Sequence, residues 1–198
     1  MTRIIAGAYG GRRLVTPAGE DTRPTADRVR EAMFSGLDAA NLIYGRRFLD
    51  LYAGSGAVGI EAASRGAEHV LLVESDPRAI RTIRENIANV DASDVVRLAA
   101  QRVSTALSAG PDTIAAGRDA ETGDKGYDIV FADPPYAIDE SDLTSMLAAL
   151  VDRGWVNAGG LVILERSKRS PEPTWVRSLT AERSRRYGET MLWYGRRS

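Results

Sequence analysis

A glycine-rich turn between an apolar segment and a helical pattern limits what this chain can fold into. Residues 48–51 are apolar enough for a buried strand, apart from Asp50, and residues 57–65 carry a helical pattern. Between them, Gly54 and Gly56 allow backbone angles and close approaches that a Cβ atom would block. Such a turn presents backbone N–H groups at a helix N-terminus beside the carboxyl end of a strand, which is the usual ligand site of an open α/β sheet.

The turn also matches a dinucleotide pattern, because residues 54–59 have the spacing GxGxxG. Alone this match is weak, and Asp50 argues against it, since a carboxylate at the strand end would repel a pyrophosphate. The same carboxylate suits a cationic ligand. S-adenosylmethionine, which has a sulfonium and an ammonium but no phosphate, therefore fits this turn better than a dinucleotide. A tight turn without any ligand is the third interpretation.

A second acidic residue follows the next apolar segment. Residues 70–73 are apolar, and Glu74 comes directly after them, fifteen residues beyond Gly59. An acid at the end of the second strand can accept hydrogen bonds from both hydroxyls of a ribose. The alternative, an acid that caps the following helix, suits Asp76 better, because the helical pattern begins near Pro77. Glu74 is therefore a candidate ribose ligand.

Strand and helix patterns alternate along the rest of the core. The predicted strands are 70–76, 95–98, 127–132 and 161–165, and the predicted helices are 77–89, 102–109 and 140–152. The tail predicts two antiparallel strands, 178–186 and 190–196, and the polar residues 117–126 predict a mobile loop. This alternation predicts a mainly parallel α/β sheet.

The first 40 residues read as an extension on this core. Two short β-like runs flank a glycine-rich turn within residues 3–16, which predicts a small hairpin. Apolar residues at i, i+3, i+4 and i+8 then predict an amphipathic helix over residues 26–38. We find no internal repeat, and we divide the chain into an N-terminal extension, 1–40, and a core domain, 41–198.

The composition excludes several kinds of chemistry. The chain has no Cys, which excludes disulfides, thiolate metal sites and methylation of pyrimidine carbon-5 through a cysteine adduct. The single histidine, His69, cannot build a metal site alone and precedes an apolar run, so we expect a strand-edge residue and no metal. No apolar run reaches transmembrane length and no secretory signal is visible. We therefore expect a cytoplasmic protein without a membrane contact.

Positive charge gathers at the two ends of the chain. The net charge is −1, but residues 1–30 carry +3 and residues 165–198 carry +5, against −9 in the middle. Basic ends on an acidic middle fit an anionic partner that is held beside the site. Arg outnumbers Lys by 24 to 2, which favours phosphate contacts, although codon bias gives the same excess. On the predicted helix, Arg28 and Arg30 either meet a nucleic acid backbone or belong to a solvated face.

A stiff loop follows the predicted strand 127–132. It reads Asp133-Pro134-Pro135-Tyr136, and the prolines fix their own φ angles while Pro135 also restricts Pro134. The Pro134 carbonyl and Asp133 thus supply two aimed acceptors, and Tyr136 supplies an aromatic face. The position after a strand places the loop in the same crevice as the glycine turn.

Two acceptors and a ring are what an exocyclic amino group on a base needs. The lone pair of such an amine is delocalised into the ring, and accepting both of its N–H groups orients that lone pair towards a methyl donor. Catalysis is then mostly positioning and electrostatics, and Asp133 need not act as a general base. A strand-ending turn with a surface Tyr would explain the loop alone. Combined with Asp50, the glycine turn and Glu74, the loop favours methylation of an amine.

These residues resemble a known family. The core is similar to class I S-adenosylmethionine-dependent methyltransferases of the amino-methylating branch, and the whole chain resembles the bacterial RsmD family of 16S ribosomal RNA guanine-N2 methyltransferases. The matching segments are Arg3–Gly7, Gly11–Leu14, Arg23–Thr25, Asp27–Glu31, Asp50–Gly59 and Asp133–Tyr136. The last two are shared by many methyltransferases, whereas the N-terminal ones are specific to the family.

The resemblance implies a fold and a cofactor site. The fold is a Rossmann-like, seven-stranded, mainly parallel sheet with the last strand antiparallel, and core residues 41–198 would form the methyltransferase domain. The cofactor would be S-adenosylmethionine, held at its methionine end by Asp50, Tyr52, Ala53, Gly54, Ser55 and Gly56 and at its ribose by Glu74 and Ser75. Family members have Asp or Asn near the adenine, but here Gln101 and Arg102 follow the third strand, so Gln101 or a backbone group is the expected contact.

The resemblance also implies a substrate and a partner. Methyl transfer would go to the 2-amino group of one guanine in 16S rRNA, free or in the small ribosomal subunit, and we expect the enzyme to act as a monomer. The catalytic residues would be Asp133, Pro134 and Tyr136. The RNA would be held mainly by residues 1–40, and the candidate contacts are Arg3, Arg12, Arg13, Arg23, Arg28, Arg30, Pro135 and Tyr136.

Other classes of protein fit these residues less well. An adenine-N6 or other amino methyltransferase that acts on DNA or another RNA would use the same loop, but no recognition-domain insertion is visible. A protein-glutamine methyltransferase would not need arginine-rich ends. A dinucleotide-dependent oxidoreductase conflicts with Asp50, and a non-catalytic RNA-binding module leaves the Asp133 loop without a purpose.

Overall fold

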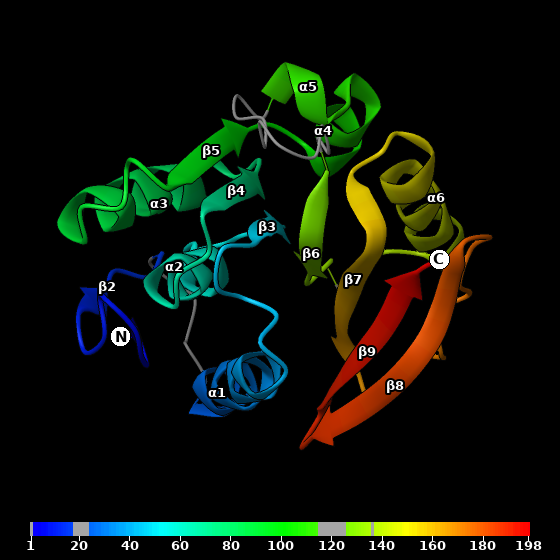
Figure 1. The fold of residues 1–198 in the computed structure, drawn as a ribbon, viewed down its shortest axis with the longest axis horizontal. Helices are drawn as coiled ribbons and strands as arrows, with labels where there is room; N and C mark the ends of the chain where they lie inside the picture. Colours follow the sequence, from blue (N-terminus) through cyan, green and yellow to red (C-terminus); the bar gives the residue numbers. More distant parts are fainter. Residues whose placement is uncertain (1, 18–23, 115–125, 136) are drawn as a thin grey trace.

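A seven-stranded sheet forms the centre of the molecule, in the order β5–β4–β3–β6–β7–β9–β8 (Figure 1). The computed structural model describes residues 2–17, 24–114, 126–135 and 137–198. The strands of the sheet are β3 Arg47–Leu51, β4 His69–Glu74, β5 Val96–Ala100, β6 Tyr127–Ala132, β7 Val156–Ser167, β8 Leu179–Tyr187 and β9 Thr190–Arg197.

Strand directions confirm the predicted class of fold. Strands β5, β4, β3, β6 and β7 are parallel, and the last strand, β9, is antiparallel to both of its neighbours, β7 and β8. The chain order reverses at the centre, because β4 and β5 lie on one side of β3 while β6 and β7 lie on the other. In open sheets of this kind, ligands bind at the carboxyl ends of the strands at such a switch point.

Helices cover both faces of the sheet. Their bounds are α1 Pro24–Ala39, α2 Ala57–Ser64, α3 Pro77–Asn89, α4 Val103–Ala109, α5 Pro111–Ile114 and α6 Glu140–Asp152. Figure 1 shows α1, α2 and α3 on one face and α4, α5 and α6 on the other. Each face has its own apolar core, one containing Phe34, Phe48 and Ile163 and the other Leu107, Leu147 and Trp155. Among the described residues, no helix is both long and apolar enough to span a membrane.

Most predicted elements occur close to the expected bounds. Helices 77–89 and 140–152 and strand 127–132 are confirmed to the residue. The prediction 161–165 was too short, because β7 begins at Val156 and its first half runs through Gly159 and Gly160, where the apolar pattern is lost. The short helix α5 was not predicted, and the predicted loop 117–126 lies, apart from its last residue, outside the described residues.

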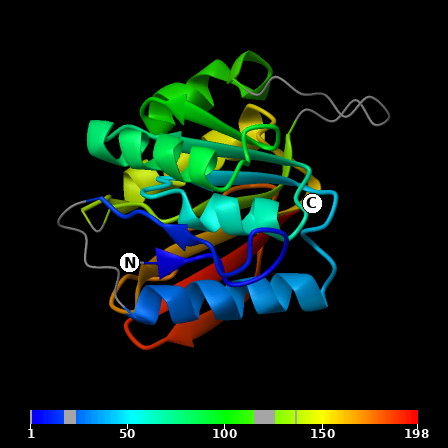
Figure 2. The same cartoon turned by 90° about the vertical axis from the view of Figure 1, so that its left-hand side faces the viewer.

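The N-terminal segment, residues 2–17, is a hairpin that lies against the helices rather than on the sheet. Its strands, β1 Thr2–Arg3 and β2 Arg13–Leu14, pair antiparallel as predicted. Figure 2 shows this segment between α1 and the α2–α3 side of the molecule. Ile4 and Leu14 are each 1% exposed and belong to the same apolar core as α1. The extension is therefore packed into the body of the fold.

Candidate functional site at the sheet switch point

The glycine turn between β3 and α2 has the conformation that its sequence predicts. Gly54 has a φ of 56° and Gly56 one of 78°, both in the left-handed region that favours glycine. A Cβ atom on Gly59 would lie 2.2 Å from the Leu72 side chain, so this glycine lets α2 approach the sheet, whereas a Cβ on Gly54 would meet nothing within 4 Å. Among the described residues, therefore, open space lies over Gly54, and no side-chain hydrogen bond caps the N-terminus of α2.

Asp50 lies beneath the turn instead of on the surface of the site. Its side chain is 1% exposed, and Oδ2 accepts a hydrogen bond of 2.9 Å from the Gly59 N–H. The other oxygen, Oδ1, is buried without a hydrogen-bond partner in the described part of the chain. The pKa of Asp50 is raised to about 8, chiefly by burial and also by the charges of Asp133 and Glu74, while the Gly59 hydrogen bond acts in the opposite direction. Asp50 thus holds the start of α2 and is a buried carboxyl that a nearby cation would stabilise in its ionised form.

Glu74 connects the end of β4 to the glycine turn. Its Oε2 accepts the Gly54 N–H at 2.8 Å, and its Oε1 accepts the N–H groups of Ser75 and Asp76 at 2.6 and 2.8 Å. Asp76 is the N-cap of α3 and accepts the Arg78 N–H at 2.9 Å, which confirms that Asp76 rather than Glu74 caps that helix. The Glu74 carboxylate is therefore held at the switch point by the backbone on both sides.

A cavity of about 660 Å³ opens beside these residues. Five of the predicted site residues line it, namely Tyr52, Glu74, Ser75, Arg102 and Pro135. The remaining walls come from the end of β4, from α4 and from the segment leading into α6, and include Val73, Val103, Ser104, Leu107, Ser108, Ala137, Ile138, Asp142, Ser145, Met146 and Ala149. This volume is in the range of small-ligand sites.

The cavity has only part of the predicted adenine site on its walls. Arg102 lines it, but Gln101 is not among its lining residues, and the Gln101 N–H donates to the carbonyl of Ala99 at 3.0 Å. Ala53 and the turn residues 54–56 also do not line it. The parts of the cavity wall that come from α4 and α6 were not predicted, because apolar residues such as Leu107 have the pattern of core positions. The sequence feature that could have identified α4 and α6 as walls of the site is that each follows a strand ending at the switch point.

Tyr52 has a strained backbone at the mouth of the cavity. Its φ is 62°, in the left-handed region, which non-glycine residues seldom adopt. Its hydroxyl lies 3.7 Å from the sulfur of Met146 on α6. Strain of this kind is often found at ligand sites, and Tyr52 lines the cavity while its hydroxyl contacts α6.

The Asp133 loop lies across the switch point from the glycine turn. Register pairs Leu51 with Ala132, so Asp133 follows β6 at the level where Tyr52 follows β3. Asp133 and Pro135 are exposed and Pro134 is buried, and the Pro135 carbonyl accepts the Ile138 N–H at 2.9 Å. Register pairs Asp50 with Phe131, so Asp133 lies two residues beyond the level of Asp50 on the adjacent strand, and its charge raises the pKa of Asp50. Tyr136 lies outside the described residues.

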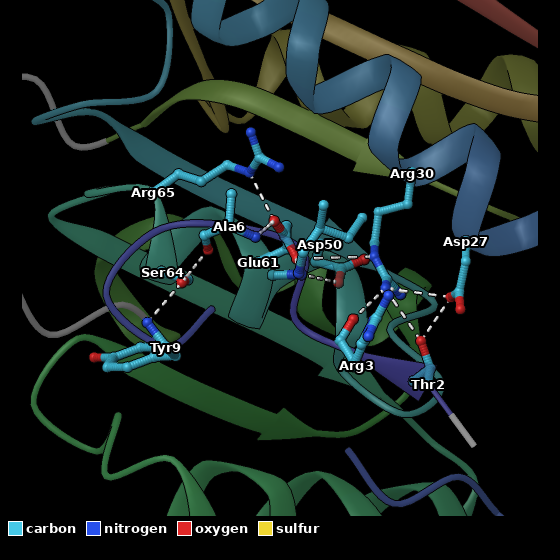
Figure 3. Close-up of polar contacts among 12 residues, drawn as sticks. Thr2, Arg3, Ala6, Tyr9, Asp27, Arg30, Asp50, Glu61, Ser64 and Arg65 are labelled. Atoms are coloured by element: carbon cyan, nitrogen blue, oxygen red, sulfur yellow. Dashed lines mark hydrogen bonds and ion pairs between the residues drawn. The ribbon is translucent and has the colours of Figure 1, made fainter. Parts of the chain in front are cut away.

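Arg30 does not lie on the surface where the sequence analysis expected an RNA contact. It is 7% exposed, its Nη2 donates to the Arg3 carbonyl at 2.7 Å and to Thr2 Oγ1 at 3.1 Å, and it pairs with Asp27 at 3.2 Å (Figure 3). Burial lowers its pKa, against the raising effects of Asp27 and Glu61. The N-terminal hairpin covers this face of α1, so Arg30 is a structural residue that ties the hairpin to the helix.

The other predicted RNA contacts differ in exposure and in partners. Arg3, Arg13 and Arg28 are exposed. Arg12 is also exposed, but it already donates to the Val90 carbonyl at 2.9 Å and lies 5.6 Å from the centre of the Tyr9 ring. Arg23 lies outside the described residues. The N-terminal segment therefore offers fewer uncommitted guanidinium groups than its composition suggests.

The single histidine is at the edge of β4, as predicted. His69 begins this strand and is half-buried. Its pKa is lowered to about 4, chiefly by burial and also by the charges of Arg47 and Arg97. Within the described ranges, no group of three or more His, Asp or Glu side chains could hold a metal ion.

Known proteins share this sequence over nearly its whole length. A family profile described as conserved hypothetical protein 95 matches residues 2–196. The Bacillus subtilis protein YlbH, which is named as an rRNA methyltransferase, is 36% identical over 188 residues, which cover 95% of each chain. Ribosomal RNA small subunit methyltransferase D of Escherichia coli K12 is 33% identical over 172 residues, which cover 87% of this chain and 78% of that protein.

A solved structure shares the fold as well. The yhhF protein of Escherichia coli, described as a methyltransferase, matches with a TM-score of 0.80 and 31% identity, over 100% of this chain and 98% of that one. The likeness includes the N-terminal hairpin, the sheet and the C-terminal strands, so it extends to both sides of the switch point.

Proposed function

The chain belongs to the RsmD family, whose profile is described as conserved hypothetical protein 95, and from this premise we propose that it transfers a methyl group from S-adenosylmethionine to the 2-amino group of a guanine in 16S ribosomal RNA. The observation that carries the proposal is the meeting of the glycine turn and the Asp133 loop at the switch point of the sheet. The turn serves the methyl donor and the loop serves the acceptor.

The residues at the switch point fit this cofactor. The cavity is large enough for a nucleoside, and Glu74 and Ser75 lie on its wall, where they would hold the ribose. Asp50 has a buried oxygen without a hydrogen-bond partner among the described residues, and the charges of Asp133 and Glu74 raise its pKa, a setting that favours a ligand with positive charge. Open space over Gly54 leaves room for its methionine end. When bound, S-adenosylmethionine supplies a methyl group that its sulfonium activates.

The Asp133 loop has the groups needed to orient an aromatic amine. An exposed carboxylate and a proline carbonyl accept the two N–H hydrogens, so that the nitrogen lone pair points at the methyl carbon. As the N–CH3 bond forms and the S–CH3 bond breaks to leave a neutral thioether, the amine would gain positive charge. Asp133 would stabilise this charge at short range until the surplus proton passes to solvent. The side chain of Tyr136 would stack on the base.

Exposed arginines at both ends of the chain support an RNA substrate. Arg3, Arg13 and Arg28 face solvent in the N-terminal 40 residues, and Arg183, Arg185 and Arg186 face solvent on β8. Contacts with phosphates would position the RNA without reading its sequence. The relatives named ribosomal RNA small subunit methyltransferase D support the choice of small-subunit rRNA. Guanine-N2 is the finer part of the proposal and follows from the resemblance to the RsmD family.

A labelled-methyl transfer assay tests this function directly. Naked 16S rRNA, undermethylated small subunits and DNA are each incubated with the protein and labelled S-adenosylmethionine, and the products are digested to nucleosides. We expect label in N2-methylguanosine from at least one rRNA substrate and none from DNA. Label in N6-methyladenosine, or in DNA, would replace the proposal with an adenine-N6 or other amino methyltransferase that acts on DNA or another RNA.

The Asp133→Ala variant tests the role of the loop. We expect a loss of methyl transfer of at least about a hundredfold while S-adenosylmethionine still binds, because the variant loses an acceptor for the amine and not the cofactor site. Asp94→Ala, which removes an exposed carboxylate before β5, is the matched control and should keep full activity. Unchanged turnover in Asp133→Ala would remove this residue from the mechanism.

A further inference from the structure

Glu165 carries a carboxyl group that the fold does not use. It lies on β7, next to β6, two residues before the carboxyl end of the strand. It is half-buried, yet in the part of the chain that the structure describes no hydrogen bond or ion pair holds its carboxyl. Its neighbour Arg166 differs, because it pairs with Glu140 of α6 at 2.8 Å.

The alternation of β7 places Glu165 on the same face of the sheet as Asp133. Ile163, two residues before it, packs in the same core as Phe131, whereas Arg166 reaches α6 on the opposite face. Register pairs Ala132 with Leu164, so Glu165 comes level with Asp133 on the adjacent strand. Burial and the charge of Asp133 raise the pKa of Glu165 to about 8, which agrees with two neighbouring carboxyls.

A guanine presents three N–H hydrogens along one edge. Two belong to the 2-amino group, which Asp133 and the Pro134 carbonyl would accept, and the third is on N1 directly beside it. Adjacent strands are about 4.8 Å apart, so carboxyls on β6 and β7 can reach neighbouring donors on one base. Adenine and cytosine present a ring acceptor next to their amino group, which an acidic oxygen at this position would repel. A hydrogen bond from N1–H would also favour the ionised form of Glu165.

We propose that Glu165 accepts the N1–H of the substrate base and thereby selects guanine. This inference rests on the proposed function and assigns its specificity to a residue outside the glycine turn and the Asp133 loop. Enzymes that read an extruded base do so through hydrogen bonds to this edge. A site built to pair with a particular N–H discriminates strongly against an analogue that lacks it.

The test removes the two partners of this hydrogen bond separately and together. Once the methylated position is known, an rRNA fragment is made with guanine or with 2-aminopurine at that position, since 2-aminopurine keeps the 2-amino group but has no N1–H. The ratio of kcat/KM for the two fragments is measured at pH 8.5 with the wild-type chain and with Glu165→Ala. We expect the wild type to prefer guanine by at least about tenfold, and the variant to reduce this preference to within about threefold.

Controls separate the inference from the function on which it rests. Glu85→Ala removes an exposed carboxylate from α3 and should keep the full preference for guanine, and S-adenosylmethionine binding verifies that each variant is folded. Glu165→Met, with a side chain of similar size, should behave like Glu165→Ala. A preference that persists in both variants would overturn the role of Glu165 while leaving guanine-N2 methylation in place. Absence of N2-methylguanosine from the wild-type reaction would instead overturn the proposed function itself.

Discussion

The two basic ends of this chain look alike in composition and differ in structure. Residues 1–30 carry a net charge of +3 and residues 165–198 carry +5. In the N-terminal segment, Arg30 is buried and Arg12 donates to the Val90 carbonyl, whereas Arg3, Arg13 and Arg28 are exposed. On the C-terminal strands β8 and β9, most of the charge faces solvent. A count of charges therefore predicts the sign of a partner but not which end meets it.

A buried acid holds the N-terminal segment in place. Glu61 on α2 is 0% exposed, and its two oxygens accept the N–H groups of Ile5 and Ala6 at 2.7 and 3.1 Å. Arg65 donates to it at 2.7 Å, and Arg30 lies 4.0 Å away. Figure 3 shows Glu61 among these groups, with the N-terminal backbone on one side and Arg65 on the other. The charges here are desolvated and contribute to the fold.

Strand β8 shows the opposite arrangement. Seven of its nine residues are exposed, and Arg183, Arg185 and Arg186 are among them. Arg183 lies over the Tyr194 ring at 4.5 Å, which orients its guanidinium without removing it from solvent. Register pairs Arg185 with Leu192 and Leu192 with Glu165, so Arg185 lies in the row that leads to the Asp133 loop. This end of the chain is better placed for an anionic partner.

The largest expected effect is on the contacts of Glu61 that hold the N-terminal segment against α2. We expect Glu61→Ala to lower the free energy of unfolding by about 3–5 kcal/mol, because it leaves a buried guanidinium and two buried N–H groups without their partner. Urea unfolding measures the loss. Glu31→Ala, on the exposed face of α1, is the control and should change stability by no more than about 0.5 kcal/mol. A loss below about 1 kcal/mol in Glu61→Ala would show that the N-terminal charges do not hold the fold.

The next largest effect is expected at a residue that contacts both the N-terminal segment and the glycine turn. Asn86 of α3 is 0% exposed, and it accepts the Val15 N–H at 2.8 Å and donates to the carbonyls of Val15 and Ser55, each at 2.9 Å. We expect Asn86→Ala to cost about 2–3 kcal/mol in unfolding free energy and to weaken S-adenosylmethionine binding, because the Ser55 carbonyl loses a donor. Calorimetric titration and urea unfolding measure the two effects.

A residue on the same helix controls for general damage to α3. Asn89 is exposed, and Asn89→Ala should change neither stability nor cofactor affinity beyond error. If Asn86→Ala lost stability but kept its cofactor affinity, the N-terminal segment and the glycine turn would be independent, and the contrast between the two ends would be one of packing alone.

The sequence predicts more of the fold than of the site. Helix 77–89 and strand 127–132 are marked by the periodicity of their apolar residues and by the residues that begin and end them, all of which are local in sequence. Both were confirmed to the residue. Arg30 was assigned to a nucleic acid contact or a solvated face, because periodicity within α1 cannot reveal that a distant hairpin covers it. The wall of the cavity was missed for a similar reason. Leu107 and Met146 have the sequence pattern of core residues, and only the folded structure shows that they line a cavity. Local patterns determine the elements, and tertiary contacts determine which side chains are exposed.

A third experiment compares the two ends in RNA binding. We expect Arg183→Ala with Arg185→Ala to weaken rRNA binding by about tenfold at moderate salt and to reduce the slope of log Kd against log salt by about 1.5, since two phosphate contacts are lost. Arg12→Ala with Arg13→Ala should reduce the slope by only about 0.7, because Arg12 is already bonded to the Val90 carbonyl. Filter binding over a salt series measures both slopes.

A pair of arginines at the far edge of the sheet is the control for net charge. Arg81 and Arg84 are exposed on α3, and replacing both with Ala changes the net charge by the same amount. Their slope should be that of the wild type. Equal slopes for the Arg183 and Arg12 pairs would remove the proposed difference between the two ends, and a larger effect of the Arg12 pair would reverse it.

The smallest expected effect tests whether charges on the C-terminal strands contribute to stability. Arg196 donates to Glu182 at 2.8 and 3.1 Å, and the two side chains are 36% and 39% exposed. The hydrogen bond from Arg196 lowers the pKa of Glu182, so the stability it contributes is present above the unfolded pKa of about 4.5 and is lost as the pH falls through the lower, folded pKa. Because solvent screens an exposed pair, we expect Glu182→Gln to cost less than about 1 kcal/mol at pH 7 and nothing measurable near pH 3. Urea unfolding at the two pH values checks both numbers. A loss above about 2 kcal/mol at pH 7 would mean that the C-terminal charges support the fold as Glu61 does, and that these strands are not a surface kept for a partner.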